Sequence, residues 1–264
     1  MTEPYMIELL FIFNEGSLLL QQQTEDCWQV GSDEQLVTLL PPSSQIITVD
    51  CGSPDLHVRA YRTECRDSPP GYEWCGLRQS YYKLSPQLYQ TAGKCSELLH
   101  WDRSTQYCGY CGERMVFHTA ISKRCTSCGR EIWPSPAVAV IVLVHRGDEV
   151  LLVHARNFKG RFFGLVAGFV ETGENLEEAV SREVMEETGL TITNIRYFRS
   201  QPWPYPLGLM VGFHADYVSG DLKLQYEELE VGGWFTCDNL PTIPEKLSIA
   251  RRIIDDWLSD EKKT

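Results

Sequence analysis

The acidic segment from Arg182 to Leu190 constrains this chain more than any other part of its sequence. It places Glu183, Glu186 and Glu187 at positions i, i+3 and i+4, so a helix would bring the three carboxylates together on one surface. Like charges at these separations repel each other, so the cluster is unfavourable unless a cation lies among them. Closely packed oxygen ligands of this kind suit Mg²⁺ or Mn²⁺.

The apolar stripe of the same predicted helix argues against a plain solvated face. Leu176 and Val180 mark that stripe. At about 100° per residue, Glu183 and Glu187 fall within about 20° of Leu176. A solvated face would carry its acids on the side opposite the stripe. The sequence therefore favours a ligand site, with a solvated helix face as the alternative.

Glycines mark the boundaries of this unit. Gly168 ends an apolar, strand-like run over 162–167, and Gly173 precedes the helix. Glu174 is favourable near the positive end of the helix dipole, and Gly189 is a natural stop after the last turn. The predicted order is strand, loop, acidic helix and turn.

The complete pattern extends from Gly168 to Leu190. It reads Gly, five residues, Glu, seven residues, then Arg-Glu-aliphatic-x-Glu-Glu-x-Gly-aliphatic, and every defined position is filled. This is the Nudix box. The chain therefore resembles the Nudix hydrolases, metal-dependent enzymes that cleave nucleoside diphosphates linked to another moiety.

Composition limits the class of protein. The chain has 264 residues, 43% of them hydrophobic, which is enough for one large domain or two domains with a small insert. Its formal net charge of −12 argues against a broad surface for nucleic acid or membranes. No stretch approaches the length of a transmembrane helix. The apolar run 6–13 lacks a basic flank, so it predicts a strand rather than a signal peptide.

Four of the ten cysteines form two C-x-x-C pairs, Cys108 with Cys111 and Cys125 with Cys128. This spacing predicts a structural zinc ribbon with one Zn²⁺, because four thiolates leave no open coordination position. An iron site of the same geometry and two vicinal redox pairs are the alternatives. The other cysteines have no ligand spacing and are expected to be free thiols: Cys27, Cys51, Cys65, Cys75, Cys95 and Cys237. Many cysteines without a secretion signal indicate a reducing, cytoplasmic location.

The order of predicted elements indicates three domains. Residues 1–104 form an N-terminal α+β domain, 105–132 the zinc ribbon, and 133–264 a Nudix domain, an α/β/α sandwich with a mixed sheet. Strands are expected at 6–13, 17–20, 46–49, 56–60, 137–144, 150–154, 195–200, 209–217 and 233–236, and helices at 88–101 and 245–259. The first domain carries no catalytic motif, and we expect an architectural role for it.

A second informative segment, 200–208, reads Ser-Gln-Pro-Trp-Pro-Tyr-Pro-Leu-Gly. Its alternating prolines make a stiff loop, and Trp203 and Tyr205 offer flat surfaces. A rigid connector is the alternative. The segment resembles the S-Q-P-W-P-F-P-x-S signature of the NADH pyrophosphatase subfamily, with Tyr205 for phenylalanine and Gly208 for the final serine. With the ribbon and the N-terminal domain, the resemblance spans essentially the whole chain.

The resemblance implies the residues of the site. Glu183, Glu186 and Glu187 match the catalytic glutamates, and Ala167 (by its main-chain carbonyl), Glu183, Glu187 and Glu228 match the Mg²⁺ or Mn²⁺ ligands. Residues that match substrate contacts are Trp133, Phe169, Gln201, Pro202, Trp203, Pro204, Tyr205, Pro206, Leu207, Gly208 and Ala250. Trp133 takes the place of a tyrosine that the family contributes from the partner subunit. Phe169 and Trp133 are alternatively ordinary core aromatics.

The same resemblance implies an activity. We expect hydrolysis of NAD(H) to NMN(H) and AMP with two or three Mg²⁺ or Mn²⁺ ions, and removal of 5′ NAD caps from RNA at the same site. It also implies a homodimer with an active site shared between subunits. The alternatives are a Nudix enzyme for ADP-ribose or dinucleoside polyphosphates, a non-catalytic nucleotide sensor, and a zinc-mediated scaffold.

Overall fold

The structure is a computed structural model that describes residues 7–261, except 26, 33–34, 39, 42–43, 53–55 and 158–159. The chain divides into two compact units. The N-terminal unit contains residues 1–135 and 204–207, and the C-terminal unit contains residues 136–203 and 208–264. Among the described helices, none is long and apolar enough to cross a membrane.

The N-terminal unit is built on a six-stranded sheet in the order β3-β2-β1-β5-β4, with β6 paired to β2. Its strands β1 and β5 run parallel, and the other pairs are antiparallel. The strands are β1 (Ile7–Asn14), β2 (Ser17–Thr24), β3 (Cys27–Gln29), β4 (Gln45–Val49), β5 (Leu56–Arg62) and β6 (Tyr72–Gly76). The helices are α1 (Gln35–Thr38), the 3₁₀ helix η1 (Gln79–Tyr82) and α2 (Pro86–Ser104).

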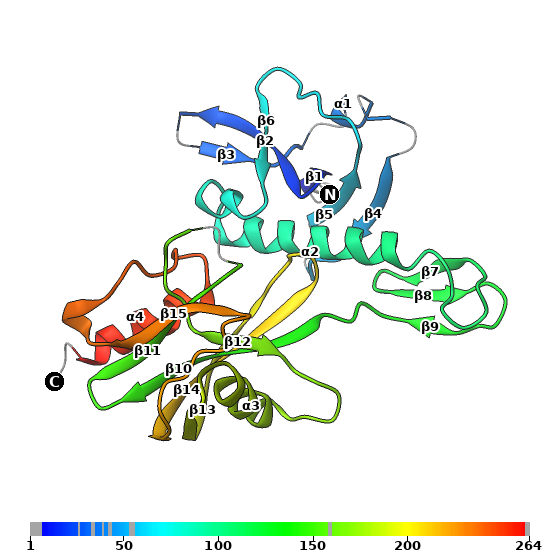
Figure 1. Cartoon of the computed structure of the whole chain (residues 1–264). Helices are drawn as coiled ribbons and strands as arrows, with labels where there is room; N and C mark the ends of the chain where they lie inside the picture. The colour runs from blue at the N-terminus through cyan, green and yellow to red at the C-terminus, as the bar shows by residue number, and fades with distance from the viewer. Residues whose placement is uncertain are drawn as a thin grey trace. The chain divides into compact units, whose positions relative to one another are not determined.

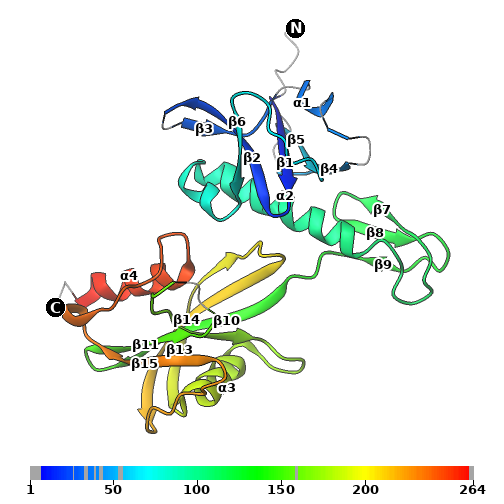
Figure 2. The same cartoon turned by 45° about the horizontal axis from the view of Figure 1, so that its top comes forward.

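Strand β1 is buried on both faces of this sheet. Because side chains alternate along a strand, Phe11 and Phe13 join the cluster beneath α2, whereas Leu10 and Ile12 join a smaller cluster on the other face. Helix α2 runs along the first of these faces (Figures 1 and 2). Its first turn is capped by the Ser85 hydroxyl, which accepts a bond from the Leu88 amide.

A small three-stranded sheet follows α2 in the same unit. Its order is β7-β8-β9, with β7 at Met115–Thr119, β8 at Ser122–Cys125 and β9 at Glu131–Ile132. Cys108 and Cys111 lie in the turn before β7, whereas Cys125 ends β8 and Cys128 lies in the turn that follows it. The ribbon is therefore a minimal sheet held largely by its ligand residues rather than by an extensive core.

The C-terminal unit is a mixed six-stranded sheet in the order β13-β14-β10-β11-β15, with β12 paired to β10. Only the central β10 and β14 run parallel among its described pairs. The strands are β10 (Ala137–Arg146), β11 (Glu149–Ala155), β12 (Val166–Phe169), β13 (Thr191–Pro202), β14 (Gly208–Ser219) and β15 (Leu229–Phe235). The helices are α3 (Leu176–Thr188), the 3₁₀ helix η2 (Cys237–Asn239) and α4 (Ile249–Glu261).

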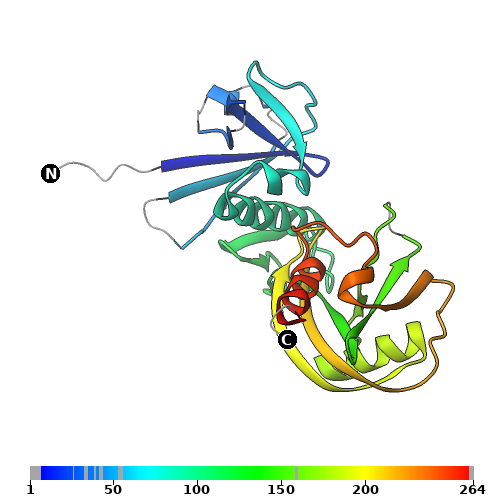
Figure 3. The ribbon, with the colours of Figure 1, turned by 90° about the vertical axis from the view of Figure 1, so that its left-hand side faces the viewer.

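Helices α3 and α4 cover opposite faces of this sheet (Figure 3). Along β10, Val140 and Val142 pack in the cluster with α3, while Ile141 and Leu143 pack in the cluster with α4. A strand buried on both faces reads as a continuous β-branched run, which is what the sequence shows at 137–144. The predicted α/β/α sandwich with a mixed sheet is confirmed.

Several predicted boundaries were wrong. Gly168 does not end the strand but lies inside β12, where it pairs with Val140. The last helix begins at Ile249 rather than 245, because Ser248 caps it by accepting a bond from the Arg251 amide at 3.3 Å. The short strands β3, β6, β7, β8 and β9 were not predicted. Met6, the first residue of the predicted strand 6–13, lies outside the described residues.

Lys123 fixes the ribbon to the end of α2. It is only 1% exposed, pairs with the Asp102 carboxylate, and donates to the Asp102 carbonyl at 2.8 Å and the Thr105 carbonyl at 3.2 Å. The ammonium group also lies near the rings of Trp101 and Phe117. The Thr105 carbonyl lies just beyond the last turn of α2, and the Asp102 carbonyl also accepts bonds from the Thr105 amide and the Gln106 side chain.

We predict that Lys123→Ala destabilises the N-terminal unit by about 3 to 5 kcal/mol, because it leaves a buried carboxylate without its cation. Guanidinium unfolding of the zinc-loaded full chain, followed by tryptophan fluorescence, measures the change. Arg124→Ala is the matched control, since Arg124 is exposed and pairs with Glu131 at the surface. Equal effects of the two substitutions would contradict this role for Lys123.

Candidate functional site

Helix α3 is fixed at both ends by its own sequence. At its start, the Asn175 side chain accepts a bond from the Glu178 amide at 2.8 Å, and the Glu178 carboxylate accepts one from the Asn175 amide at 2.9 Å. At its end, Gly189 adopts a left-handed conformation with φ of 71°. These two caps fix where the helix begins and ends, and the packing of Ala179, Val180 and Val184 determines which face lies against the sheet.

Two glutamates of the acidic cluster face inward. Glu183 is 9% exposed and Glu187 is 3% exposed, in the same stripe as Val180 and Val184. Glu186 is exposed. A solvated helix face would expose all three acids, so that alternative was wrong.

Burial and mutual repulsion perturb both inward carboxyls. Loss of hydration is the main cause that raises the pKa of Glu187 to about 8, and the nearby charges of Glu183, Glu228 and Glu186 contribute to the same rise. The pKa of Glu183 is also raised, mainly by burial and against the opposing effect of Arg182. Each carboxylate is thus held where its charge is unfavourable, which is the condition that a bound divalent cation relieves.

Arg182 is the cation among these acids. Its guanidinium donates to Glu174 at 2.5 and 3.0 Å, to Glu183 at 2.9 Å and to Glu186 at 2.9 Å. It also donates to the Phe169 carbonyl at 2.9 Å. These contacts raise the pKa of Arg182 and tie helix α3 to the end of β12. Glu174 was expected to act through the helix dipole, and in the structure its carboxylate accepts hydrogen bonds from Arg182.

A later loop carries the fourth acid to the same place. The amides of Lys223 and Gln225 donate to the carbonyls of Thr188 and Glu187, each at 2.9 Å. Those carbonyls belong to the last turn of α3 and have no helical partner, so the loop satisfies them. This attachment brings Glu228 close enough to raise the pKa of Glu187.

Gly168 provides the space that the Glu183 carboxylate occupies. A Cβ atom at Gly168 would lie 2.0 Å from both Cδ and Oε1 of Glu183. The backbone of Gly168 is not in the left-handed region, so the requirement is for space rather than for conformational freedom. A glycine is therefore needed here because the helix carboxylate rests directly against the strand.

The first group of predicted residues is thus gathered on one face of the C-terminal unit. Carboxylate and main-chain carbonyl oxygens are the donors that Mg²⁺ or Mn²⁺ prefers, and Ala167 lies one residue before Gly168 on β12. In the described ranges, no three of these carboxylates have ligand atoms within 4.8 Å of one another. Phe169 follows on the same strand and is 65% exposed, so it is not a core aromatic. Ala167, Glu183, Glu187 and Glu228 remain the predicted cation ligands, with the exposed Glu186 beside them.

A second group lies at the start of α4. Gln201 is buried, and its amide nitrogen donates to the Leu247 carbonyl at 2.9 Å. Its amide oxygen has no partner within the described part of the chain. Ala250 is the second residue of α4, where the backbone N–H has no helical acceptor. The structure therefore brings these two predicted substrate contacts to the same helix end.

The loop between β13 and β14 is divided between the units. Trp203 donates its amide to the Gly208 carbonyl at 2.8 Å within the C-terminal unit. A Cβ at Gly208 would lie 3.2 Å from the Trp203 carbonyl, so the glycine that replaces the signature serine occupies a tight position. Residues 204–207 instead group with the N-terminal unit. There the Tyr205 hydroxyl bonds that of Tyr89 at 2.7 Å.

The remaining members of the predicted substrate set lie outside these groups. Pro202 ends β13 and is exposed, and Leu207 packs against the N-terminal core. Trp133 belongs to the N-terminal unit and is 55% exposed, so it is not a core aromatic either.

The cysteines form a separate metal site. The sulfurs of Cys108 and Cys128 are 3.7 Å apart, and those of Cys111 and Cys125 are 3.4 Å apart. A tetrahedral Zn²⁺ about 2.3 Å from each sulfur would hold them about 3.8 Å apart. Backbone amides of Cys128 and Ser127 lower the pKa of Cys125 to about 6. Within the described ranges, this is the one group of three or more metal-binding side chains whose ligand atoms lie within 4.8 Å of one another.

Three family profiles match almost the whole chain. The NUDIX domain matches residues 134–258, the NADH pyrophosphatase-like rudimentary NUDIX domain matches 8–101, and the NADH pyrophosphatase zinc ribbon domain matches 103–132. The resemblance was expected to include the N-terminal domain, but the Nudix-like character of residues 8–101 was not predicted. The Nudix box, the motif that identified the C-terminal Nudix domain, lies only at 168–190.

Curated relatives agree with these profiles. A protein of Klebsiella pneumoniae named NAD-capped RNA hydrolase NudC is 42% identical over 242 residues, which are 88% of this chain and 93% of the relative. The protein of that name from Stutzerimonas stutzeri is 41% identical over 72% of this chain and 69% of the relative. The one from Pectobacterium atrosepticum is 45% identical over 64% of this chain, a match that spans just under two thirds (65%) of the relative.

A solved structure supports the fold. The crystal structure of a NUDIX hydrolase from Nitrosomonas europaea superposes with a TM-score of 0.51 at 22% sequence identity. The match covers 60% of this chain and 93% of that one.

We predict that Gly168→Ala weakens Mn²⁺ binding by about 10- to 100-fold, the range for losing the support of a metal ligand. The added methyl group would displace the Glu183 carboxylate from its position against β12. Isothermal titration calorimetry with Mn²⁺ measures the change. Gly233→Ala is the matched control, because its Cβ would meet nothing closer than 3.6 Å in the same sheet. Unchanged Mn²⁺ affinity in Gly168→Ala would refute the steric argument.

Proposed function

This chain belongs to the Nudix hydrolases, in the NADH pyrophosphatase group, and on that premise we propose that it hydrolyses the pyrophosphate of NAD(H) to NMN(H) and AMP. We propose removal of 5′ NAD caps from RNA as a second reaction of the same site, because the relatives are named for that activity. One observation carries the proposal most directly. Glu183 and Glu187 are buried side by side with raised pKa values at the position of the complete box.

The acidic residues and Arg182 would have different roles in the reaction. Glu183, Glu187 and Glu228, with the Ala167 carbonyl, would hold two or three Mg²⁺ or Mn²⁺ ions. Bound ions of this kind neutralise charge on phosphoryl oxygens and lower the pKa of water. Glu186 stands beside them as a further ligand or proton acceptor. Arg182 keeps Glu183 and Glu186 oriented while leaving Glu187 outside its hydrogen bonds.

The substrate contacts come from the second group. The exposed ring of Phe169 follows the box glycine and would stack on nicotinamide. The unpaired oxygen of Gln201 and the N–H of Ala250 would bind polar groups of the dinucleotide. Because the chain is acidic overall, recognition of a capped RNA would centre on the cap and its first nucleotides.

We further propose a cytoplasmic homodimer in which Trp133 reaches the site of the partner subunit. Its exposed ring and the family pattern support this placement. The four-cysteine cluster would hold one structural Zn²⁺ per subunit. We also divide the chain into domains at 1–104, 105–132 and 133–264, boundaries close to those of the three family profiles.

Two other functions are compatible with the fold. A Nudix enzyme acting on ADP-ribose or dinucleoside polyphosphates would use the same acidic helix with different substrate contacts. A non-catalytic nucleotide sensor or a zinc-mediated scaffold would not require four acids around one helix turn. The retained acids favour an enzyme.

We predict that incubation with NADH and Mn²⁺ yields NMNH and AMP in equal amounts, and that Glu187→Gln lowers this rate by several orders of magnitude. The substitution removes one metal-binding charge while preserving the shape of the helix. Chromatographic product analysis measures both. Glu177→Gln is the control, because Glu177 is an exposed acid on the same helix. Near-normal turnover by Glu187→Gln, or faster cleavage of ADP-ribose than of NADH, would exclude the proposed activity.

We predict that Glu183→Gln reduces hydrolysis of NAD and of NAD-capped RNA by the same factor under matched Mn²⁺ concentrations. The reason is that one set of carboxylates would serve both substrates. Release of NMN from each substrate is the measurement. Loss of NAD hydrolysis with intact decapping would mean that the two reactions use separate sites.

A further inference from the structure

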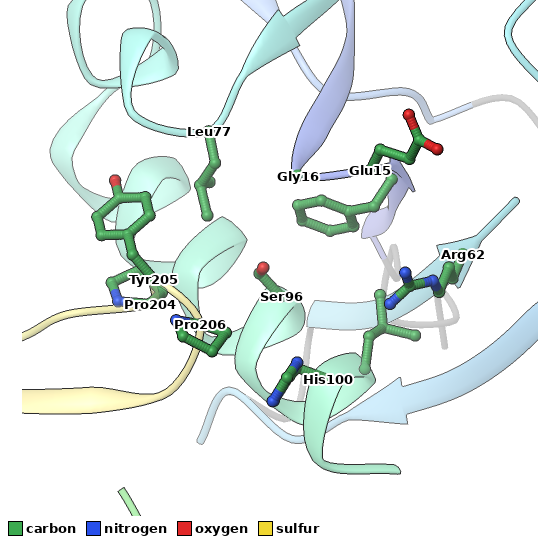
Figure 4. A pocket seen from close by; sticks show the side chains of 11 residues that line it. Glu15, Gly16, Arg62, Leu77, Ser96, His100, Pro204, Tyr205 and Pro206 are labelled. Carbon is green, nitrogen blue, oxygen red and sulfur yellow. The ribbon is translucent and has the colours of Figure 1, made fainter. Parts of the chain in front are cut away.

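A cavity of about 350 Å³ lies in the N-terminal unit, apart from the acidic helix. It is bounded by β1, β5, helix α2 and residues 204–206, all of which belong to the same unit (Figure 4). Its volume is within the range of small-molecule binding sites. Its lining shares Pro204, Tyr205 and Pro206 with the predicted substrate set, and none of the predicted metal ligands lines it.

Three polar side chains face this cavity without protein partners. Arg62, Ser96 and His100 line it, and within the described part of the chain none of their side chains makes a hydrogen bond or ion pair. The guanidinium, hydroxyl and imidazole groups offer hydrogen-bond donors from two directions, β5 and α2. Polar groups that line a cavity without partners are available to bind a ligand.

The Arg62 guanidinium brings a positive charge to this cavity in a protein that is acidic overall. Ser96, His100 and Arg103 follow one another at i, i+4 and i+7 on α2, so they lie along one stripe of the helix. Burial lowers the pKa of Arg62, and the neighbouring charge of Arg103 lowers it further, against the smaller opposing effects of Glu64 and Glu15. The one acid of the lining, Glu15, pairs with Arg66 at 2.9 Å, and its carboxylate is turned away from Ser96. An anion would relieve the repulsion between the two arginines.

The rest of the lining is apolar and aromatic. Phe13 and Leu77 come from the core beneath α2, and the loop contributes Tyr205 and Pro206. Flat apolar surfaces opposite a cationic end suit a ligand with a planar ring and an anionic group. A free phosphate ion would leave most of the cavity unfilled.

We propose that this cavity binds a free nucleoside monophosphate, with its phosphate on Arg62, Ser96 and His100 and its base beside Phe13 and Tyr205. An arginine fork matches two phosphate oxygens at once, which an ammonium group does not. The site is separate from the catalytic glutamates and does not depend on the proposed reaction. Because residues 204–206 form one wall, the ligand would also order the loop that carries the substrate signature.

The test is calorimetric titration of AMP into the zinc-loaded full chain without Mg²⁺ or Mn²⁺. Saturable binding is expected, and Arg62→Gln should weaken it by about tenfold or more, the value of a lost charged hydrogen bond. Ser96→Leu, which fills the cavity from α2, should also abolish it. Arg66→Gln is the matched control, since Arg66 is exposed and does not line the cavity. Circular dichroism checks that each variant is folded.

Further measurements distinguish this cavity from the catalytic site. Binding of AMP should survive Glu187→Gln, so failure of the proposed hydrolysis leaves this result intact. Inorganic phosphate should bind more weakly than AMP, because it cannot use the aromatic wall. Any of three results would overturn the proposal. These are an absence of saturable AMP binding, equal AMP binding by the wild type and Arg62→Gln, and an effect of Arg62→Gln on capped RNA but not on AMP.

Discussion

The burial of two carboxylates on the sheet-facing side of α3 is the constraint around which the C-terminal unit is organised. Glu183 and Glu187 take places in the helix stripe that would otherwise hold apolar residues such as Val180 and Val184. Their burial raises both pKa values and reduces the stability of the fold unless a cation is nearby. The protein supplies part of that compensation through Arg182 and leaves the rest to be supplied by bound cations. A divalent cation bound beside these carboxylates would offset the cost of burying their charges.

The remaining structure holds this unfavourable cluster in place. Gly168 on β12 has no side chain, and this leaves space for the Glu183 carboxylate. The Phe169 carbonyl on the same strand accepts a hydrogen bond from Arg182. The loop before β15 satisfies the last carbonyls of α3 and thereby delivers Glu228. Helix α3 is capped at both ends by flanking residues, and Ala179, Val180 and Val184 pack its inner face against the sheet. Each contact restricts the positions that the carboxylates can adopt.

The N-terminal unit uses different means for its stability. Its sheet has a continuous core beneath α2, whereas its ribbon relies on four thiolates and on the buried ammonium of Lys123. The unit matches a rudimentary Nudix domain, yet the diagnostic spacing of glycine and glutamates is confined to 168–190. It carries a cavity lined by Arg62, whose side chain makes no hydrogen bond or ion pair within the described part of the chain. The family match over 8–101 therefore rests on residues other than those of the box.

The sequence alone determined the reaction chemistry and the order of the elements. A long local motif such as the box, or the two cysteine pairs, encodes helix face, turns and ligand identity within a few dozen residues, so no distant contact is needed to interpret it. Short strands such as β3 and β9 escaped prediction because neighbouring strands stabilise them more than their own residues do. The contact of Gly168 with Glu183 and the contact of Gln201 with Leu247 were decided only by tertiary structure. So were the cavity beside Arg62 and the attachment of Gln225 to α3, because each joins residues far apart in the chain.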